Sequence, residues 1–144
     1  MKPLPRLLFV CVENSNRSQM AEAFARLHGA GAVEAFSAGS RPSGRINPKA
    51  IEAMRERGCD LAAHGSKSLA DVPQGEYAAA ITMGCGDACP LVNAALREDW
   101  QLPDPREMPP AEFRKVRDEI EARVLALLER LGVQQGTRNR RSAP

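Results

Sequence analysis

The chain of 144 residues has the length of one domain, and with 43% hydrophobic and 26% charged residues it has the composition of a folded globule. A net charge of +2 and an aromatic content of 4% argue against a nucleic-acid partner, because they supply neither a basic surface nor a platform for base stacking. No apolar run approaches the roughly 20 residues that span a bilayer. Met1–Pro5 leads into no secretory signal, so we expect a cytoplasmic protein without a membrane partner.

The domain organisation is simple. The sequence contains no internal repeat and no linker long enough to separate two domains. We therefore expect one domain over residues 1–132 and a disordered tail over residues 133–144, because Gly136 to Pro144 is polar and basic. We also expect the protein to be a monomer.

An apolar run, a polar loop and a helical pattern follow one another near the N-terminus. Leu7–Val10, which ends at Cys11, is typical of a buried parallel strand. A helix is expected to begin near Ser15 and to end at Gly29. Its large apolar residues recur at helical spacing and should share one buried face: Met20, Phe24 and Leu27.

Further strands alternate with a second helix. We predict strands at Val33–Ser37 and Tyr77–Met83, and a weaker strand near Trp100. The second helix should begin at Asn47-Pro48, where a capping residue precedes a proline at the first helical position, and should end near Gly58.

The last helix is predicted from Pro109-Pro110 to a stop at Gly132. Its apolar residues recur at helical spacing: Phe113, Val116, Ile120, Val124, Leu127 and Leu131. Strands that alternate with helices imply a parallel sheet with right-handed crossovers, hence an α/β fold. In such sheets a ligand binds at the carboxyl ends of the strands, so we look for chemistry in the loop after the first strand.

That loop carries the strongest chemical signal, in the string Cys11, Val12, Glu13, Asn14, Ser15, Asn16, Arg17 and Ser18. Because it joins a strand to a helix N-terminus, its backbone N–H groups can converge on one tetrahedral oxyanion. Arg17 adds a fork of donors, and Cys11 at the base lies in the same positive field, which favours a nucleophilic thiolate. The hydroxyls of Ser15 and Ser18 can bond the thiolate or hold the loop, whereas Glu13 opposes anion binding unless it points outward. The alternative interpretation is a buried cysteine that ends a core strand, beside a solvated arginine.

Cys-x5-Arg-Ser after the first strand, with Asp104-Pro105 far downstream, resembles the low-molecular-weight protein tyrosine phosphatase superfamily. Longer strings are closer to its arsenate reductase branch: Asn14–Glu22, Phe36–Gly39, Asn47-Pro48, Thr82–Pro90 and Phe113–Ile120. The resemblance covers roughly Arg6 to Leu131. It implies a flavodoxin-like, three-layer α/β/α fold with a four-stranded parallel sheet in the order 2-1-3-4.

The resemblance also implies a relay of thiols and no cofactor. Cys11 attacks arsenate held by Arg17 and the loop, and Cys85 then attacks the Cys11 sulfur, so that arsenite departs. Cys89 next attacks Cys85, and thioredoxin or a low-molecular-weight thiol system reduces the resulting disulfide. Asp104 is the candidate proton donor; its alternative role is that of a turn residue before proline.

Two other functions need only part of this set. A phosphatase for phosphotyrosine or small phosphoesters needs Cys11, Arg17 and Asp104, and a non-catalytic oxyanion sensor needs only the loop, which phosphate or sulfate would also occupy as arsenate mimics. The two distal cysteines favour the reductase. Arg106 and Glu107 stand where phosphotyrosine-selective members carry aromatic residues, which lowers the likelihood of a phosphatase.

We expect no bound metal. The four cysteines form no CxxC pair and are accompanied by two histidines, His28 and His64, which we expect at the surface or in loops. Some reductases of the family hold potassium through an Asn, a Glu, a Ser and an Asp. Asn14, Glu22 and Ser37 match the first three, but Lys67 stands in place of the Asp, so that its ammonium would replace the cation.

Overall fold

The computed structural model describes residues 4–84 and 92–133, which contain a four-stranded sheet in the order β2-β1-β3-β4. All three strand pairings are parallel. The strands are β1 (Arg6–Cys11), β2 (Glu34–Gly39), β3 (Tyr77–Thr82) and β4 (Ala94–Asp99). The helices are α1 (Arg17–His28), α2 (Pro48–Arg55) and α3 (Pro110–Arg130), with short 3-10 turns η1 (Leu61–Ala63) and η2 (Leu69–Asp71). The flavodoxin-like fold and the predicted strand order are confirmed.

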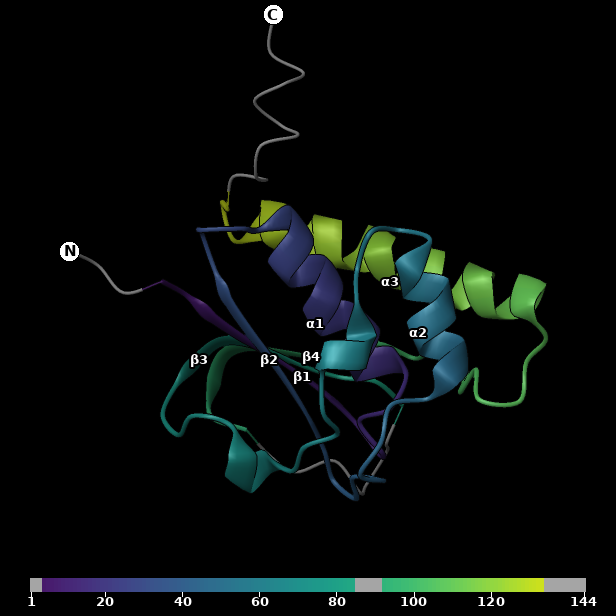
Figure 1. The fold of residues 1–144 in the computed structure, drawn as a ribbon. Coiled ribbons are helices and arrows are strands. Elements are labelled where there is room, and N and C mark those ends of the chain that lie inside the picture. The colour runs from purple at the N-terminus through teal and green to yellow at the C-terminus, as the bar shows by residue number, and fades with distance from the viewer. Residues whose placement is uncertain (1–3, 85–91, 134–144) are drawn as a thin grey trace, which may run out of the picture.

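The three α-helices pack over one face of the sheet (Figure 1). Alternate residues of β1 divide between the two faces, as the pleat of a strand requires. Leu7 and Phe9 join the main core with the α-helices, whereas Leu8 and Val10 join a smaller buried cluster with Tyr77. In the described ranges η2 lies against this second face, so both faces of the sheet are covered, as is usual for parallel strands.

The long helix α3 closes the main core as predicted. Its buried residues recur every three or four positions and include Phe113, Val116, Ile120, Val124 and Leu127, although Leu131 is only partly buried. β4 ends directly before Trp100, whose ring lies 6.1 Å from that of Phe9. Within residues 4–84 and 92–133, no helix is both long and apolar enough to cross a membrane.

Helix α1 buries a different face from the predicted one. Leu27 is 43% exposed, whereas His28 is buried and stacks on Phe24. The Nε2 atom of His28 lies 2.8 Å from the carboxylate of Glu121 on α3. A helix of 3.6 residues per turn brings positions 20, 24 and 28 into line, and Glu121 satisfies the polar ring there. The expectations for Leu27 and His28 were therefore wrong.

The register of the sheet brings the end of β1 level with the end of β2. Cys11 pairs with Gly39, and the loop that follows Cys11 folds directly over this glycine. A Cβ atom on Gly39 would lie 2.6 Å from the carbonyl oxygen of Val12 and 3.0 Å from the backbone nitrogen of Asn14. Both of these are backbone atoms, so a side chain at this position forces the loop to move.

We predict that Gly39→Ala destabilises the protein by roughly 1–3 kcal/mol, the usual cost of overpacking, and weakens the binding of inorganic phosphate. Urea unfolding and calorimetric titration with phosphate measure the two effects. Gly65→Ala is the matched control, because a Cβ atom at Gly65 meets no other atom within 4 Å. Equal unfolding midpoints and equal phosphate affinities for the two variants would contradict the prediction.

Candidate functional site

The loop between β1 and α1 has its carbonyl groups turned outward. Each carbonyl of residues 12–16 accepts a hydrogen bond from a group beside the loop. The pairs are Val12 with Arg41 N (2.8 Å), Glu13 with Ser43 N (3.1 Å), Asn14 with Gln19 Nε2 (3.3 Å), Ser15 with Asn47 N (3.1 Å) and Asn16 with Met20 N (3.0 Å). Three of the five donors lie in the segment between β2 and α2, so this distant part of the chain fixes the loop from outside.

Outward carbonyls leave the backbone N–H groups on the inner side of the loop. In a planar trans peptide the N–H points opposite to the carbonyl, so the N–H groups of residues 13–16 face inward. Within the described part of the chain these N–H groups have no acceptor. Asn14 has a positive φ of 54°, the left-handed conformation that successive N–H groups need in order to converge. With the N-terminus of α1 beside them, they form a concave donor surface suited to an oxyanion.

Cys11 lies at the base of this surface and is buried. Its Sγ atom is 2.8 Å from Oγ of Ser18. The same Oγ accepts a hydrogen bond of 2.8 Å from Nδ2 of Asn14. Because Asn14 donates to the oxygen of Ser18, the hydroxyl proton of Ser18 is free to point at the sulfur. A hydrogen bond to sulfur stabilises the thiolate, the form that acts as a nucleophile.

Arg17 is buried beside the same surface. Its Nη1 atom donates to the carbonyl of Leu102 at 3.0 Å, whereas its Nε atom has no partner among the described residues. A buried donor without an acceptor is costly, so an unpaired Nε fits a place where a ligand supplies the acceptor. Gly84 leaves space here, because a Cβ atom on it would lie 3.0 Å from Nη1 of Arg17.

Gln19 supports the loop from below, and sequence reasoning gave it no role. Its amide donates to Oδ1 of Asn14 (2.8 Å) and to the carbonyl of Gly65 (2.9 Å). Its Oε1 accepts from Nδ1 of His64 (2.9 Å), and burial lowers the pKa of that imidazole below its usual value. The backbone N–H of Lys67 also donates to Oδ1 of Asn14 (2.7 Å). The sequence signal for this supporting role is the polar side chain of Gln19, which directly precedes Met20 on the buried side of the first helix.

A second polar group surrounds the buried carboxylate of Glu22. Ser37 donates its hydroxyl to Glu22, Arg26 lies 2.7 Å from the carboxylate, and Nζ of Lys67 lies 3.6 Å from it. Nζ of Lys67 also donates to the carbonyl of Gly65 at 3.0 Å. The structure therefore places the Lys67 ammonium among the side chains named from the sequence. Within residues 4–84 and 92–133, no group of three or more His, Cys, Asp and Glu residues is arranged to hold a metal ion.

The carboxylate of Glu13 points out of the loop and pairs with Arg106 at 3.0 Å. Its charge is therefore directed away from the oxyanion site, as anion binding requires. The loop that carries Asp104 also contacts the site through the carbonyl of Leu102. Asp104 itself is exposed, and its Oδ1 accepts the backbone N–H of Arg106 at 3.1 Å. In the described structure its carboxylate holds this turn and makes no hydrogen bond to the oxyanion loop.

The remaining cysteines are Cys59 and the two that were predicted to act in a relay, Cys85 and Cys89. Cys85 and Cys89 lie outside the described residues. The strand that precedes them, β3, pairs with β1, and Met83 N donates to the carbonyl of Val10 at 2.9 Å. Cys59 is a free thiol that follows the turn after α2, and desolvation there raises its pKa and so favours the unreactive thiol.

A parallel sheet whose first strand ends in a cysteine and leads into a loop suited to an oxyanion defines a class of α/β enzymes that bind tetrahedral oxyanions. The sequence profile described as low molecular weight phosphotyrosine protein phosphatase matches residues 6–137, and the chain belongs to this family.

Three relatives illustrate the similarity. A glutaredoxin arsenate reductase of Synechocystis sp. is 37% identical over 131 residues, which cover 89% of this chain and 99% of the relative. A solved arsenate reductase in the phosphate binding state has a TM-score of 0.78 at 36% identity, with coverage of 88% of this chain and 98% of its own. A thioredoxin-dependent arsenate reductase of Corynebacterium glutamicum has a TM-score of 0.75 at 32% identity, and the match covers 91% of this chain and 63% of that chain.

We predict that potassium does not raise the melting temperature of the protein beyond the effect of sodium at the same ionic strength, because the Lys67 ammonium already accompanies Glu22. Lys67→Met should lower stability by about 1–2 kcal/mol, since it removes a cation from a buried carboxylate. Thermal unfolding in matched chloride salts measures both. Lys115→Met is the control, because Lys115 is 76% exposed. A rise of the wild-type melting temperature in potassium alone would contradict this expectation.

Proposed function

We propose that the protein is an arsenate reductase in which Cys11 is the nucleophile and Cys85 and Cys89 carry the oxidation away. The observation that carries this proposal is the oxyanion loop itself, with its N–H groups, the unpaired Nε of Arg17 and the Cys11 sulfur around one concave surface. Arsenate is a tetrahedral oxyanion that fits such a surface. Relatives that are named arsenate reductases and match nearly the whole folded chain support this substrate.

The first step forms a bond between sulfur and arsenic. The Cys11 thiolate attacks arsenate, and one oxygen leaves as water after it is protonated. Arg17 and the N–H groups of residues 12–18 bind the remaining oxygens, and Ser18 stabilises the thiolate before attack. Asp104 is the proposed proton donor, for which its carboxyl group has to leave the turn in which it now accepts the N–H of Arg106.

The second and third steps move two electrons. The Cys85 thiolate attacks the Cys11 sulfur, the electrons of the sulfur–arsenic bond pass to arsenic, and arsenic(V) leaves as arsenite. The Cys89 thiolate then attacks Cys85, which frees Cys11 and leaves a disulfide between the two distal cysteines. An external dithiol reduces this disulfide. We propose thioredoxin or a low-molecular-weight thiol system, in keeping with the glutaredoxin and thioredoxin in the names of the relatives.

A phosphatase is the second candidate, and the mouth of the site argues against phosphotyrosine as its substrate. The ion pair between Glu13 and Arg106 lies there, with no aromatic side chain among the residues of the adjacent pocket. We further propose that residues 1–132 act as one domain, as a monomer in the cytoplasm. A reducing compartment suits this chemistry, because the relay needs thiols that begin each cycle reduced.

We predict that Cys11→Ser abolishes arsenate reduction, because a serine hydroxyl at neutral pH is not ionised as a thiolate is. Arg17→Lys should reduce kcat/KM by about 100-fold or more, since an ammonium cannot reproduce the planar fork of donors. Arsenate-dependent consumption of NADPH with a coupled reductase and thioredoxin measures both. Turnover by Cys11→Ser within tenfold of the wild type would contradict the proposal.

We also predict that Cys89→Ser releases one arsenite per molecule and stops as a disulfide between Cys11 and Cys85, because the last attacking thiol is missing. Cys85→Ser should stop earlier, with no disulfide to Cys11. Mass spectrometry after arsenate treatment distinguishes the two, and Cys59→Ser is the matched control, expected to turn over like the wild type. If Cys89→Ser forms no such linkage and cycles at the wild-type rate, reduction instead uses Cys11 and an external thiol alone.

A further inference from the structure

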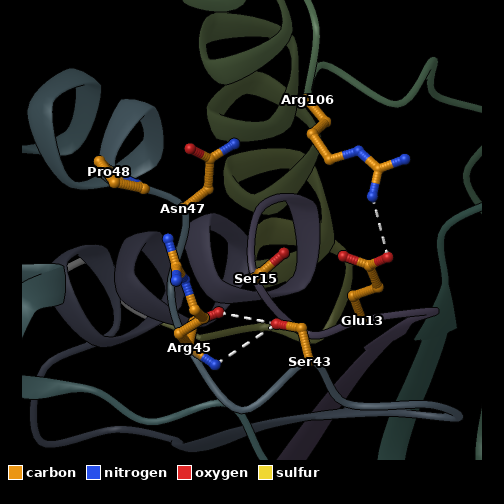
Figure 2. A pocket seen from close by; sticks show the side chains of 7 residues that line it. All are labelled: Glu13, Ser15, Ser43, Arg45, Asn47, Pro48 and Arg106. Atoms are coloured by element: carbon orange, nitrogen blue, oxygen red, sulfur yellow. Dashed lines mark hydrogen bonds and ion pairs between the residues drawn. The ribbon is translucent and has the colours of Figure 1, made fainter.

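A pocket of about 270 Å³ opens beside the oxyanion loop (Figure 2). Its lining includes Glu13 and Ser15 of the loop, Arg45 and Asn47 from the segment before α2, and Arg106 from the loop after β4. A single tetrahedral ion in the oxyanion loop would leave this volume free for another group. The pocket is close to the lower limit of about 300 Å³ that is typical of small-molecule sites.

The charged groups of this pocket favour an anion. The guanidinium of Arg106 pairs with Glu13, whereas that of Arg45 has no acceptor among the described residues. Two guanidiniums therefore face one carboxylate, which leaves a net positive charge. In Figure 2 the side chains of Arg45 and Arg106 lie on opposite sides of Ser15.

Neutral donors add to this charge. The Oδ1 atom of Asn47 accepts the N–H of Lys49 as the cap of α2, so its Nδ2 group remains as a donor. The N-terminus of α2 contributes the positive end of its dipole at the same wall. Ser15 supplies a hydroxyl between this wall and the oxyanion loop. The groups left for a ligand are thus mostly donors.

We propose that this pocket is a second anion subsite, which binds the carboxylate of a small organic phosphoester whose phosphate occupies the oxyanion loop. Glu13 and Ser15 belong to both the loop and the pocket, so the two sites adjoin, as a single short ligand requires. A carboxylate suits a guanidinium because two parallel hydrogen bonds form. Glu13 now holds Arg106, and it competes with the ligand carboxylate for this partner. The inference rests on the proposed function only in requiring that the loop binds an oxyanion.

Calorimetric titration with phosphoglycolate and with ethyl phosphate, at constant ionic strength, tests the subsite without any turnover. The two probes have nearly the same size, and only phosphoglycolate carries a carboxylate. We expect phosphoglycolate to bind wild-type protein about tenfold more tightly, as one charged hydrogen-bonded pair provides. Arg45→Gln should reduce this ratio to about threefold or less, and Glu13→Gln should increase it by freeing Arg106. Arg41→Gln is the matched control, because it removes the same charge from the same segment outside the pocket lining, and it should leave the ratio unchanged.

Each other result overturns the subsite. Equal affinities of the two probes for the wild type, or an equal loss of preference in Arg41→Gln and Arg45→Gln, means that the pocket does not recognise the carboxylate. If free glycolate binds the phosphate-loaded protein as tightly as phosphoglycolate binds the free protein, the pocket is a separate carboxylate site and not a subsite for a phosphoester. If inorganic phosphate itself fails to bind, the oxyanion loop and the proposed function fail as well, whereas phosphate binding without a preference between the probes removes the subsite alone.

Discussion

The site depends on one constraint, which is that every carbonyl of residues 12–16 is bonded from outside the loop. Without these bonds the peptide planes could rotate, and carbonyl oxygens would then repel an anion at the place where N–H groups now point. The donors from residues 41–47 belong to the chain just after β2. Gly39 makes this arrangement possible, because only a glycine at the end of β2 lets the loop after β1 approach so closely. The sheet register that pairs Cys11 with Gly39, the close approach of the loop to Gly39 and the inward N–H groups therefore depend on one another.

Carboxylates near an anion site need cationic partners, and both Glu13 and Glu22 have them. Glu13 on the outer rim pairs with Arg106, and Glu22 beneath the loop is accompanied by Arg26 and Lys67. A neighbouring cation shortens the distance over which the charge of each carboxylate acts. The electrostatic field at the loop is therefore set by its N–H groups and Arg17. The electrostatics of the site thus come from residues on several elements rather than from the loop alone.

Local patterns in the sequence were sufficient for the first three strands, the three α-helices and the loop after Cys11, because alternation and helical spacing depend on near neighbours. The fourth strand was expected only near Trp100, and the structure places it at Ala94–Asp99. The resemblance to a known family added the strand order. Contacts between distant residues were beyond local patterns: Glu13 and Arg106, like His28 and Glu121, are separated by 93 positions. For the same reason the buried side of α1 was misjudged at Leu27. The geometry of Asp104 agrees with its interpretation as a turn residue before proline. Its role as a proton donor stays a prediction.

The ammonium of Lys67 beside Glu22 has a consequence for how the protein meets changes in its surroundings. A dissociable ion occupies its site according to its concentration, so its stabilising effect varies with the medium by mass action. A cation that is covalently part of the chain is present at every salt composition and cannot be diluted away. The positive charge of Lys67 beside Glu22 is therefore independent of the ions in the medium, but it becomes sensitive to chemistry on a single amine. Acetylation of that amine would remove the charge in one step.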